Sequence, residues 1–102
     1  MQTQQEIIDR IVKILSKDEN IDKILFFGSY LVNGKPYEVS LIIFEKESPN
    51  YLISQFHYEK LLKEVAQGLI LNILPVNSAQ AEMSLNRRLE DALCIYQKKE
   101  TA

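Results

Sequence analysis

The sequence predicts an α/β (α+β) fold, a small mixed β-sheet with flanking helices in the chain order α-β-β-α-β-α-β. Three observations support this fold class. An amphipathic helical pattern opens the chain, a strand pair around an Asn-Gly turn follows, and later apolar runs of strand length alternate with stretches of helix length. At 102 residues the chain has room for one domain, residues 1–102, with one core.

Composition narrows the class of protein. The chain is 46% hydrophobic and 25% charged, which are ordinary values for a globular domain. Its net charge of −2 argues against a nucleic-acid partner, because proteins that neutralise phosphates usually carry an excess of basic residues. The single cysteine, Cys94, excludes an internal disulfide and a Cys-rich zinc site.

The sequence also bears on localisation. No apolar run approaches the roughly 20 residues that a membrane span needs, so no membrane association is expected. The polar start MQTQQE is unlike a signal peptide. We therefore expect a soluble, cytoplasmic protein.

The first helix is expected over residues 3–16. Thr3 and Glu6 have the spacing of a capping box, in which each side chain accepts a hydrogen bond from a backbone N–H at the helix start. The apolar residues then recur mostly at three- and four-residue spacing, which gives one broad face for packing on a sheet. They are Ile7, Ile8, Ile11, Val12, Ile14 and Leu15.

Two strands joined by a tight turn are expected next, over residues 23–27 and 37–44. Asn33-Gly34 predicts the turn, because both central residues of a type I′ hairpin need positive φ. This turn sets the register of the hairpin. The facing pairs that follow are Val32 with Lys35, Ser29 with Glu38, and Phe27 with Ser40.

The second of these strands presents two different faces. One carries Tyr37, Val39, Leu41 and Ile43, and the other carries Glu38, Ser40, Ile42 and Phe44. Half of the second face is apolar, so it is not a solvated face. We expect a helix of this chain, a partner or a second copy to cover it.

The second half of the chain predicts a helix, a strand, a helix and a last strand. The helix spans residues 52–67 and closes at Gly68, with Leu52, Phe56, Leu61, Leu62 and Val65 as its apolar positions. Residues 69–75 are expected to form a buried strand, interrupted only by Asn72. A helix from residue 77 or 78 to about 89 comes next. Residues 92–97 could extend it or form a fourth strand; we favour the strand, with Cys94 as a small buried apolar residue.

Gly28-Ser29 after an apolar strand, followed by a second strand at residues 37–43, resembles the signature of the minimal nucleotidyltransferase family of the DNA polymerase β superfamily. That family has strand, Gly-Ser, an Arg-bearing turn, and then Ser-Asp-x-Asp-Leu on the next strand. LILNILPV and residues 88–96 are similar to its later strand and closing segment. The resemblance covers about residues 24–97 and rests on the order and spacing of these motifs.

The resemblance implies transfer of a nucleoside monophosphate from a triphosphate to an acceptor oxygen. In the family, carboxylates at i and i+2 of one strand and a third from a neighbouring strand hold Mg²⁺. The glycine lets the backbone approach the triphosphate, while the serine hydroxyl and adjacent amides hold phosphate oxygens. By this resemblance, Gly28 and Ser29 are the candidate nucleotide- and phosphate-binding residues.

Of the three positions where the family has a metal-binding carboxylate, only one carries a carboxylate in this sequence. Glu38 falls on the first aspartate of the family, Ser40 on the second and Asn72 on the third, so one carboxylate of three remains. The turn has Tyr30 and Asn33 where the family has arginine. Mg²⁺ sites normally use carboxylates together with substrate phosphates, so Glu38 is the one candidate metal ligand and metal-dependent transfer is not expected.

Each site residue also has a purely structural interpretation. Gly28-Ser29 can be a bulge in the hairpin, with Ser29 beside Glu38. The Glu38 carboxylate can pair with a lysine such as Lys35. Asn72 can be a buried amide whose hydrogen bonds go to the backbone. His57 is expected to be a helix-surface imidazole.

These observations lead to three functional hypotheses. The first is a degenerate, inactive nucleotidyltransferase-like interaction module, since small members of the family often pair with a helical HEPN-type protein as the antitoxin of a prokaryotic toxin-antitoxin system. It needs no cofactor. The second is a nucleotide-binding protein or an enzyme with residual activity, using Mg²⁺ and a nucleoside triphosphate at Gly28, Ser29 and Glu38. The third is a homodimeric scaffold.

Overall fold

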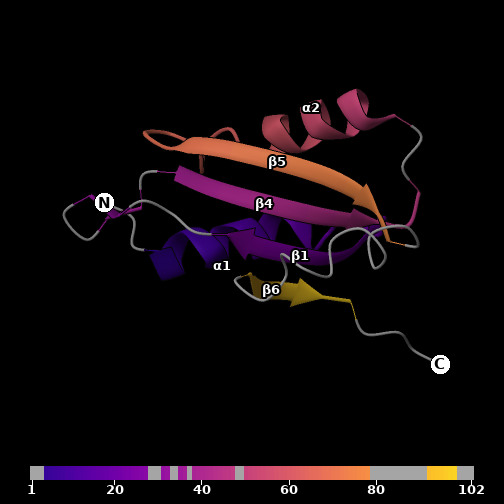
Figure 1. The fold of residues 1–102 in the computed structure, drawn as a ribbon, viewed down its shortest axis with the longest axis horizontal. Coiled ribbons are helices and arrows are strands. Elements are labelled where there is room, and N and C mark those ends of the chain that lie inside the picture. The colour runs from indigo at the N-terminus through magenta and orange to yellow at the C-terminus, as the bar shows by residue number, and fades with distance from the viewer. Residues whose placement is uncertain are drawn as a thin grey trace.

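The computed structural model contains one four-stranded mixed sheet in the order β5-β4-β1-β6 (Figure 1). Strand β5 runs parallel to β4, and β1 runs antiparallel to both β4 and β6. These strands are β1 (Ile21–Phe27), β4 (Glu38–Glu45), β5 (Ile70–Asn77) and β6 (Leu93–Gln97). The structure describes residues 4–27, 31–32, 35–36, 38–47, 50–78 and 92–98.

Within the described residues two helices accompany the sheet, α1 (Gln4–Leu15) and α2 (Tyr51–Leu61). In Figure 1, α2 lies beside β5 at one edge of the sheet, and β6 forms the opposite edge. This arrangement confirms the predicted fold class and the predicted fourth strand. The helix predicted to follow β5 lies almost entirely in residues 79–91, outside the described part of the chain.

Helix α1 packs its apolar face into the main core, as predicted. Ile7, Ile8, Ile11 and Leu15 are buried, and the last two are 0% exposed. They contact buried residues from β1 and β4. Thr3 lies outside the described residues, so the capping box stays a prediction.

The register of the hairpin is confirmed. Phe27 pairs with Ser40 between β1 and β4, and Val32 pairs with Lys35 between two short strands, β2 (Leu31–Val32) and β3 (Lys35–Pro36). Ser29, the predicted partner of Glu38, and the turn at residues 33–34 lie outside the described residues, so that facing pair stays a prediction. Strand β1 starts two residues earlier than predicted, at Ile21.

The two faces of β4 enter different clusters of side chains. Val39, Leu41 and Ile43 belong to the main core with α1. On the opposite face, Ile42 and Phe44 pack with Leu25 and are only 6% and 5% exposed. The ammonium of Lys23 lies 5.6 Å from the centre of the Phe44 ring. At these two positions the chain itself supplies the cover, which is one of the alternatives that the sequence left open.

Helix α2 begins at a side-chain cap and ends earlier than predicted. The Oδ1 atom of Asn50 accepts hydrogen bonds from the backbone N–H groups of Leu52 and Ile53, at 2.9 and 3.3 Å. The helix ends at Leu61 rather than at residue 67, and residues 62–68 form successive turns. Gly68 has φ of 77°, the left-handed conformation expected of a residue that closes a helical segment.

The orientation of α2 differs from the prediction. Leu62 and Val65 are buried as expected, but the helix turns Ser54 and Tyr58 inward. Leu52 and Phe56, predicted as apolar core positions, are each 69% exposed. Tyr58 donates a hydrogen bond to the buried carboxylate of Glu45. This contact sets the rotation of the helix, because it requires the side that carries Tyr58 to face the core.

Both edge strands are more exposed than their apolar sequences suggest. Among the described strands, β5 pairs only with β4, and its Ile70 and Leu74 are 45% and 38% exposed, so the prediction of a buried strand is wrong. Cys94 on β6 is also exposed, contrary to prediction, because an edge strand is covered by one neighbouring strand only. No helix in the described residues is long and apolar enough to cross a membrane.

Candidate functional site

The three positions predicted to correspond to metal-binding carboxylates lie together on one face of the sheet. The parallel register of β4 and β5 places Ser40 opposite Asn72, and Glu38 lies two residues before Ser40 on the same face of β4. The amide Nδ2 of Asn72 donates a hydrogen bond to Oε1 of Glu38 at 2.7 Å and lies 3.5 Å from Oγ of Ser40. The interpretation of Asn72 as a buried amide bonded to the backbone is wrong.

This cluster does not fit a divalent cation. Mg²⁺ and Ca²⁺ require oxygen acceptors, and Asn72 turns its amide nitrogen, a donor, toward the only carboxylate of the cluster. The reverse amide orientation would set an oxygen acceptor against a carboxylate oxygen, which is repulsive. The amide therefore occupies the space between the side chains of residues 38 and 40. In the described part of the chain, no group of three His, Cys, Asp or Glu residues is placed to hold a metal.

A groove of about 530 Å³ borders the cluster. Its polar wall includes Ser40 and Asn72 from the sheet, and Gln55 and Glu59 from α2. The Nε2 atom of Gln55 also donates to the backbone oxygen of Ile73 at 3.2 Å, which ties α2 to the outer edge of β5. The apolar lining includes Phe27, Ile42, Tyr51 and Leu74. The volume is within the range of small-molecule sites, about 300 to 1,000 Å³.

Helix α2 contributes to this groove, which was not predicted from the sequence. Tyr51, Gln55 and Glu59 are spaced by four residues, so they share one side of the helix. Their four-residue spacing was the feature of the sequence from which this side of the groove could have been predicted. The predicted phosphate-binding residues Gly28 and Ser29 lie outside the described residues, although Phe27, directly before them, lines the groove.

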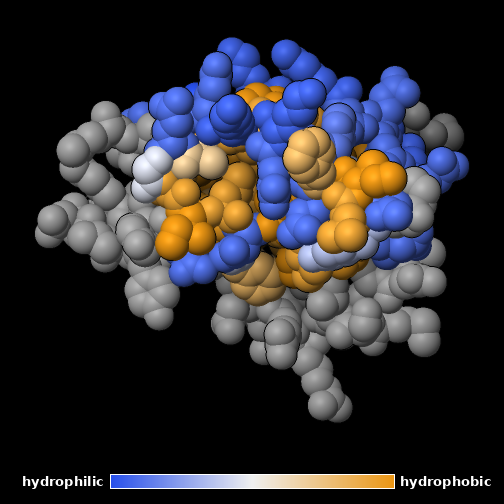
Figure 2. All heavy atoms as spheres, turned by 90° about the horizontal axis from the view of Figure 1, so that it is seen from above, coloured by the Kyte–Doolittle hydropathy of each residue, from blue (hydrophilic) through white to orange (hydrophobic). Residues whose placement is uncertain are grey.

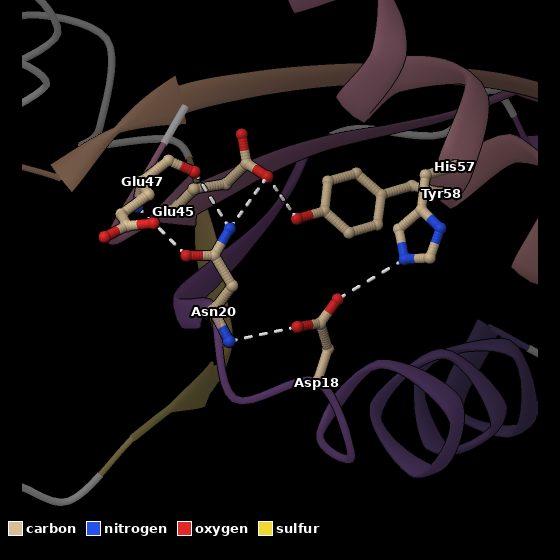
Figure 3. Close-up of polar contacts among 6 residues, drawn as sticks. All are labelled: Asp18, Asn20, Glu45, Glu47, His57 and Tyr58. Carbon is tan, nitrogen blue, oxygen red and sulfur yellow. Dashed lines mark hydrogen bonds and ion pairs between the residues drawn. The ribbon is translucent and has the colours of Figure 1, made fainter. Parts of the chain in front are cut away.

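A second polar cluster lies at the far end of β4. Figure 3 shows the side chains of Tyr58, from α2, and Asn20, from the turn between α1 and β1, converging on the carboxylate of Glu45. The Tyr58 hydroxyl donates to Oε2 of Glu45 at 2.5 Å, and Nδ2 of Asn20 lies 3.4 Å from the same oxygen. Glu45 is only 2% exposed. These contacts hold a buried carboxylate in place and join three elements.

Two neighbouring side chains of α2, Tyr58 and His57, lie in different surroundings at this cluster. Burial raises the pKa of Tyr58 well above its ordinary value of 10.0, and the hydrogen bond and negative charge of Glu45 and the charge of Asp18 raise it further. His57 was expected to be a surface imidazole, and its side chain is indeed 53% exposed. Its Nε2 atom nevertheless lies 3.5 Å from Oδ2 of Asp18, a neighbour distant in sequence (Figure 3).

Comparison with known proteins gives a likeness of fold only. No protein-family model matches the sequence, and no curated protein matches it. A chain from the structure of a tri-AMPylated Shewanella oneidensis HEPN toxin in complex with MNT antitoxin superposes with a TM-score of 0.64 at 15% identity, covering 94% of this chain and 74% of that one. A chain from the toxin-antitoxin complex MntA-HepT gives 0.57 at 11% identity, covering 93% and 74%. At these identities the likeness shows a shared fold.

Proposed function

We propose that this chain is a catalytically inactive, nucleotidyltransferase-like interaction module that binds a helical HEPN-type toxin as an antitoxin does. The observation that carries the proposal is the likeness in fold, over more than nine-tenths of this chain, to chains from two structures that are both toxin-antitoxin complexes. A shared fold alone does not transmit function. The proposal therefore also draws on the chemistry of the cluster formed by Glu38, Ser40 and Asn72.

That chemistry supports binding without nucleotidyl transfer. Metal-assisted transfer needs cations that bridge the phosphates and neutralise the charge that develops on them. Glu38 is the single carboxylate among the three positions, and its Oε1 atom is already engaged by the Asn72 amide. An antitoxin that acts by occupying its toxin needs neither carboxylate nor cation, so this cluster is compatible with that role.

Co-expression with a HEPN-type toxin tests the proposal. We expect wild-type protein to relieve the growth arrest that the toxin causes and to elute with it as one complex in size-exclusion chromatography. Glu38→Gln is expected to relieve the arrest equally well, because no transfer step is involved. Intact-mass spectrometry of the toxin should show no added nucleoside monophosphate after incubation with ATP and Mg²⁺.

Two outcomes of that experiment would contradict the proposal in different ways. Failure of the two proteins to form a complex would remove the antitoxin role. Relief of growth arrest that is lost in Glu38→Gln, together with a toxin that gains nucleotide mass, would mean that the chain is an enzyme.

The groove beside the cluster favours a second candidate function, nucleotide binding. Its volume suits a nucleotide-sized ligand, and Tyr51 offers an aromatic ring that is 46% exposed. Isothermal titration of ATP or GTP with Mg²⁺ into the purified protein distinguishes the candidates. Under our proposal we expect no saturable heat. Saturable binding that disappears in Gly28→Val or Ser29→Ala would establish a phosphate site and favour this second function.

A further inference from the structure

The outer face of α2 is apolar although it faces solvent. Leu52, Ile53 and Phe56 are 69%, 67% and 69% exposed, and their spacing places them on the side of the helix opposite Ser54 and Tyr58. Helices at the surface of soluble proteins normally turn polar residues outward. We call these three residues the α2 stripe. Figure 2, which looks onto α2 and β5, shows orange apolar side chains gathered in two groups with polar side chains between them.

The size of this surface suits self-association. The three residues of the α2 stripe together expose roughly 400 Å², within the roughly 300 to 600 Å² found for the largest apolar patch of ordinary monomers, a patch that is often functional. Two such surfaces facing each other would bury roughly 800 Å². With the surrounding polar residues, that total approaches the roughly 1,200 to 2,000 Å² of stable, specific interfaces.

The charges around the stripe permit two copies to meet. The exposed charged residues that follow Phe56 are two acids and two lysines, so the surface has no net charge to repel an identical one. They are Glu59, Lys60, Lys63 and Glu64. All four lie toward the C-terminal side of the stripe. If two α2 helices pair antiparallel, the two stripes overlap and these charges point away from each other into solvent.

The geometry of such a pair follows from two-fold symmetry. With the axis near residue 54, Leu52 of each copy packs against Phe56 of the other, and the two Ile53 side chains meet close to the axis. We propose that the α2 stripe binds the α2 stripe of a second copy of this chain and forms a two-fold symmetric homodimer. This inference does not depend on the proposed antitoxin role, because it involves no toxin.

Sedimentation velocity of the full chain tests the proposal. We expect a mass of twice 11.8 kDa at micromolar concentrations. The double variant Leu52→Glu/Phe56→Glu should be monomeric, with at least a tenfold weaker dimer, and should keep the wild-type circular dichroism because both residues are largely exposed. Leu93→Glu is the matched control: it changes an apolar residue that is 52% exposed on β6, far from α2 in the sheet order, and should leave the dimer intact.

Oxidative cross-linking tests the register. In a Cys94→Ser background, Ile53→Cys should form a covalent dimer readily with copper phenanthroline as oxidant. Lys63→Cys should not, because residue 63 lies beyond the end of α2 at Leu61, so in an antiparallel pair the two cysteines lie at opposite ends of the interface.

Three results would overturn the proposal. They are a wild-type protein that stays monomeric across the concentration range, a dimer that persists in Leu52→Glu/Phe56→Glu, and cross-linking at residue 63 in preference to residue 53. If the wild type is monomeric and the same double substitution instead abolishes a complex with the toxin, the stripe belongs to a foreign partner and not to a second copy.

Discussion

Replacing Tyr58 by phenylalanine is expected to lower the free energy of unfolding by about 2 to 3 kcal/mol, because it removes a hydrogen-bond donor to a buried carboxylate. The Tyr58 hydroxyl lies 2.5 Å from Oε2 of Glu45, whose side chain is almost entirely removed from solvent. For a domain of this size the midpoint of thermal unfolding should fall by roughly 10 to 20 °C. Urea denaturation followed by circular dichroism measures the change.

Tyr51→Phe is the matched control for this experiment. Tyr51 is 46% exposed, so loss of its hydroxyl should change the free energy of unfolding by no more than about 0.5 kcal/mol. A double-mutant cycle with Glu45→Gln isolates the contribution of the pair, since the effect of Tyr58→Phe should shrink when the carboxylate is already absent. Equal effects of Tyr58→Phe and Tyr51→Phe would show that the Glu45 contact adds no stability.

Alkaline pH provides a further readout of the same contact. Because the folded state raises the pKa of Tyr58, mainly through burial, it favours the protonated phenol. The stabilisation is complete below about pH 10, where the tyrosine of the unfolded chain is also protonated, and it declines as the pH rises above that value. The stability difference between wild type and Tyr58→Phe should therefore narrow by about 1.4 kcal/mol between pH 8 and pH 11.

Introducing two aspartates, Ser40→Asp with Asn72→Asp, is expected to create a dependence on divalent cations that the wild type lacks. With Glu38 these substitutions place three carboxylates on adjacent strands, where the Asn72 amide now bridges Glu38 and Ser40. Without metal the carboxylates repel one another and the variant should be less stable than the wild type. At a Mg²⁺ concentration about ten times the dissociation constant, binding restores about 1.4 kcal/mol.

Thermal unfolding with and without Mg²⁺ or Mn²⁺ measures this effect. We expect a rise of roughly 6 to 11 °C for the double variant and no shift for the wild type. Adding Glu38→Gln to the double variant should reduce the shift by removing one ligand. A wild-type midpoint that rises with Mg²⁺ to the same extent would contradict our interpretation that the wild-type cluster does not fit a divalent cation.

Much of the sheet could be predicted from local patterns. The Asn33-Gly34 signal was enough to predict that Phe27 faces Ser40 and that Val32 faces Lys35, because a two-residue turn and the alternation of side chains together set the register. The family resemblance marked Glu38, Ser40 and Asn72 as one site, and the parallel pairing of β4 with β5 brings them together. The local sequence could not predict that the amide nitrogen of Asn72 faces Glu38, because that contact forms only when β4 and β5 pair.

The sequence by itself determined the fold class, the hairpin register and the presence of one carboxylate among the three candidate site positions. Only the tertiary structure decided which face of α2 points inward, because both faces carry apolar residues and local pattern could not choose between Phe56 and Tyr58. Tyr58 can give a hydroxyl to the buried carboxylate of Glu45, whereas Phe56 cannot. With Tyr58 turned inward, the α2 stripe is exposed on the opposite side of the helix. The surface proposed for a second copy therefore follows from a buried hydrogen bond between two residues that are thirteen positions apart in the chain.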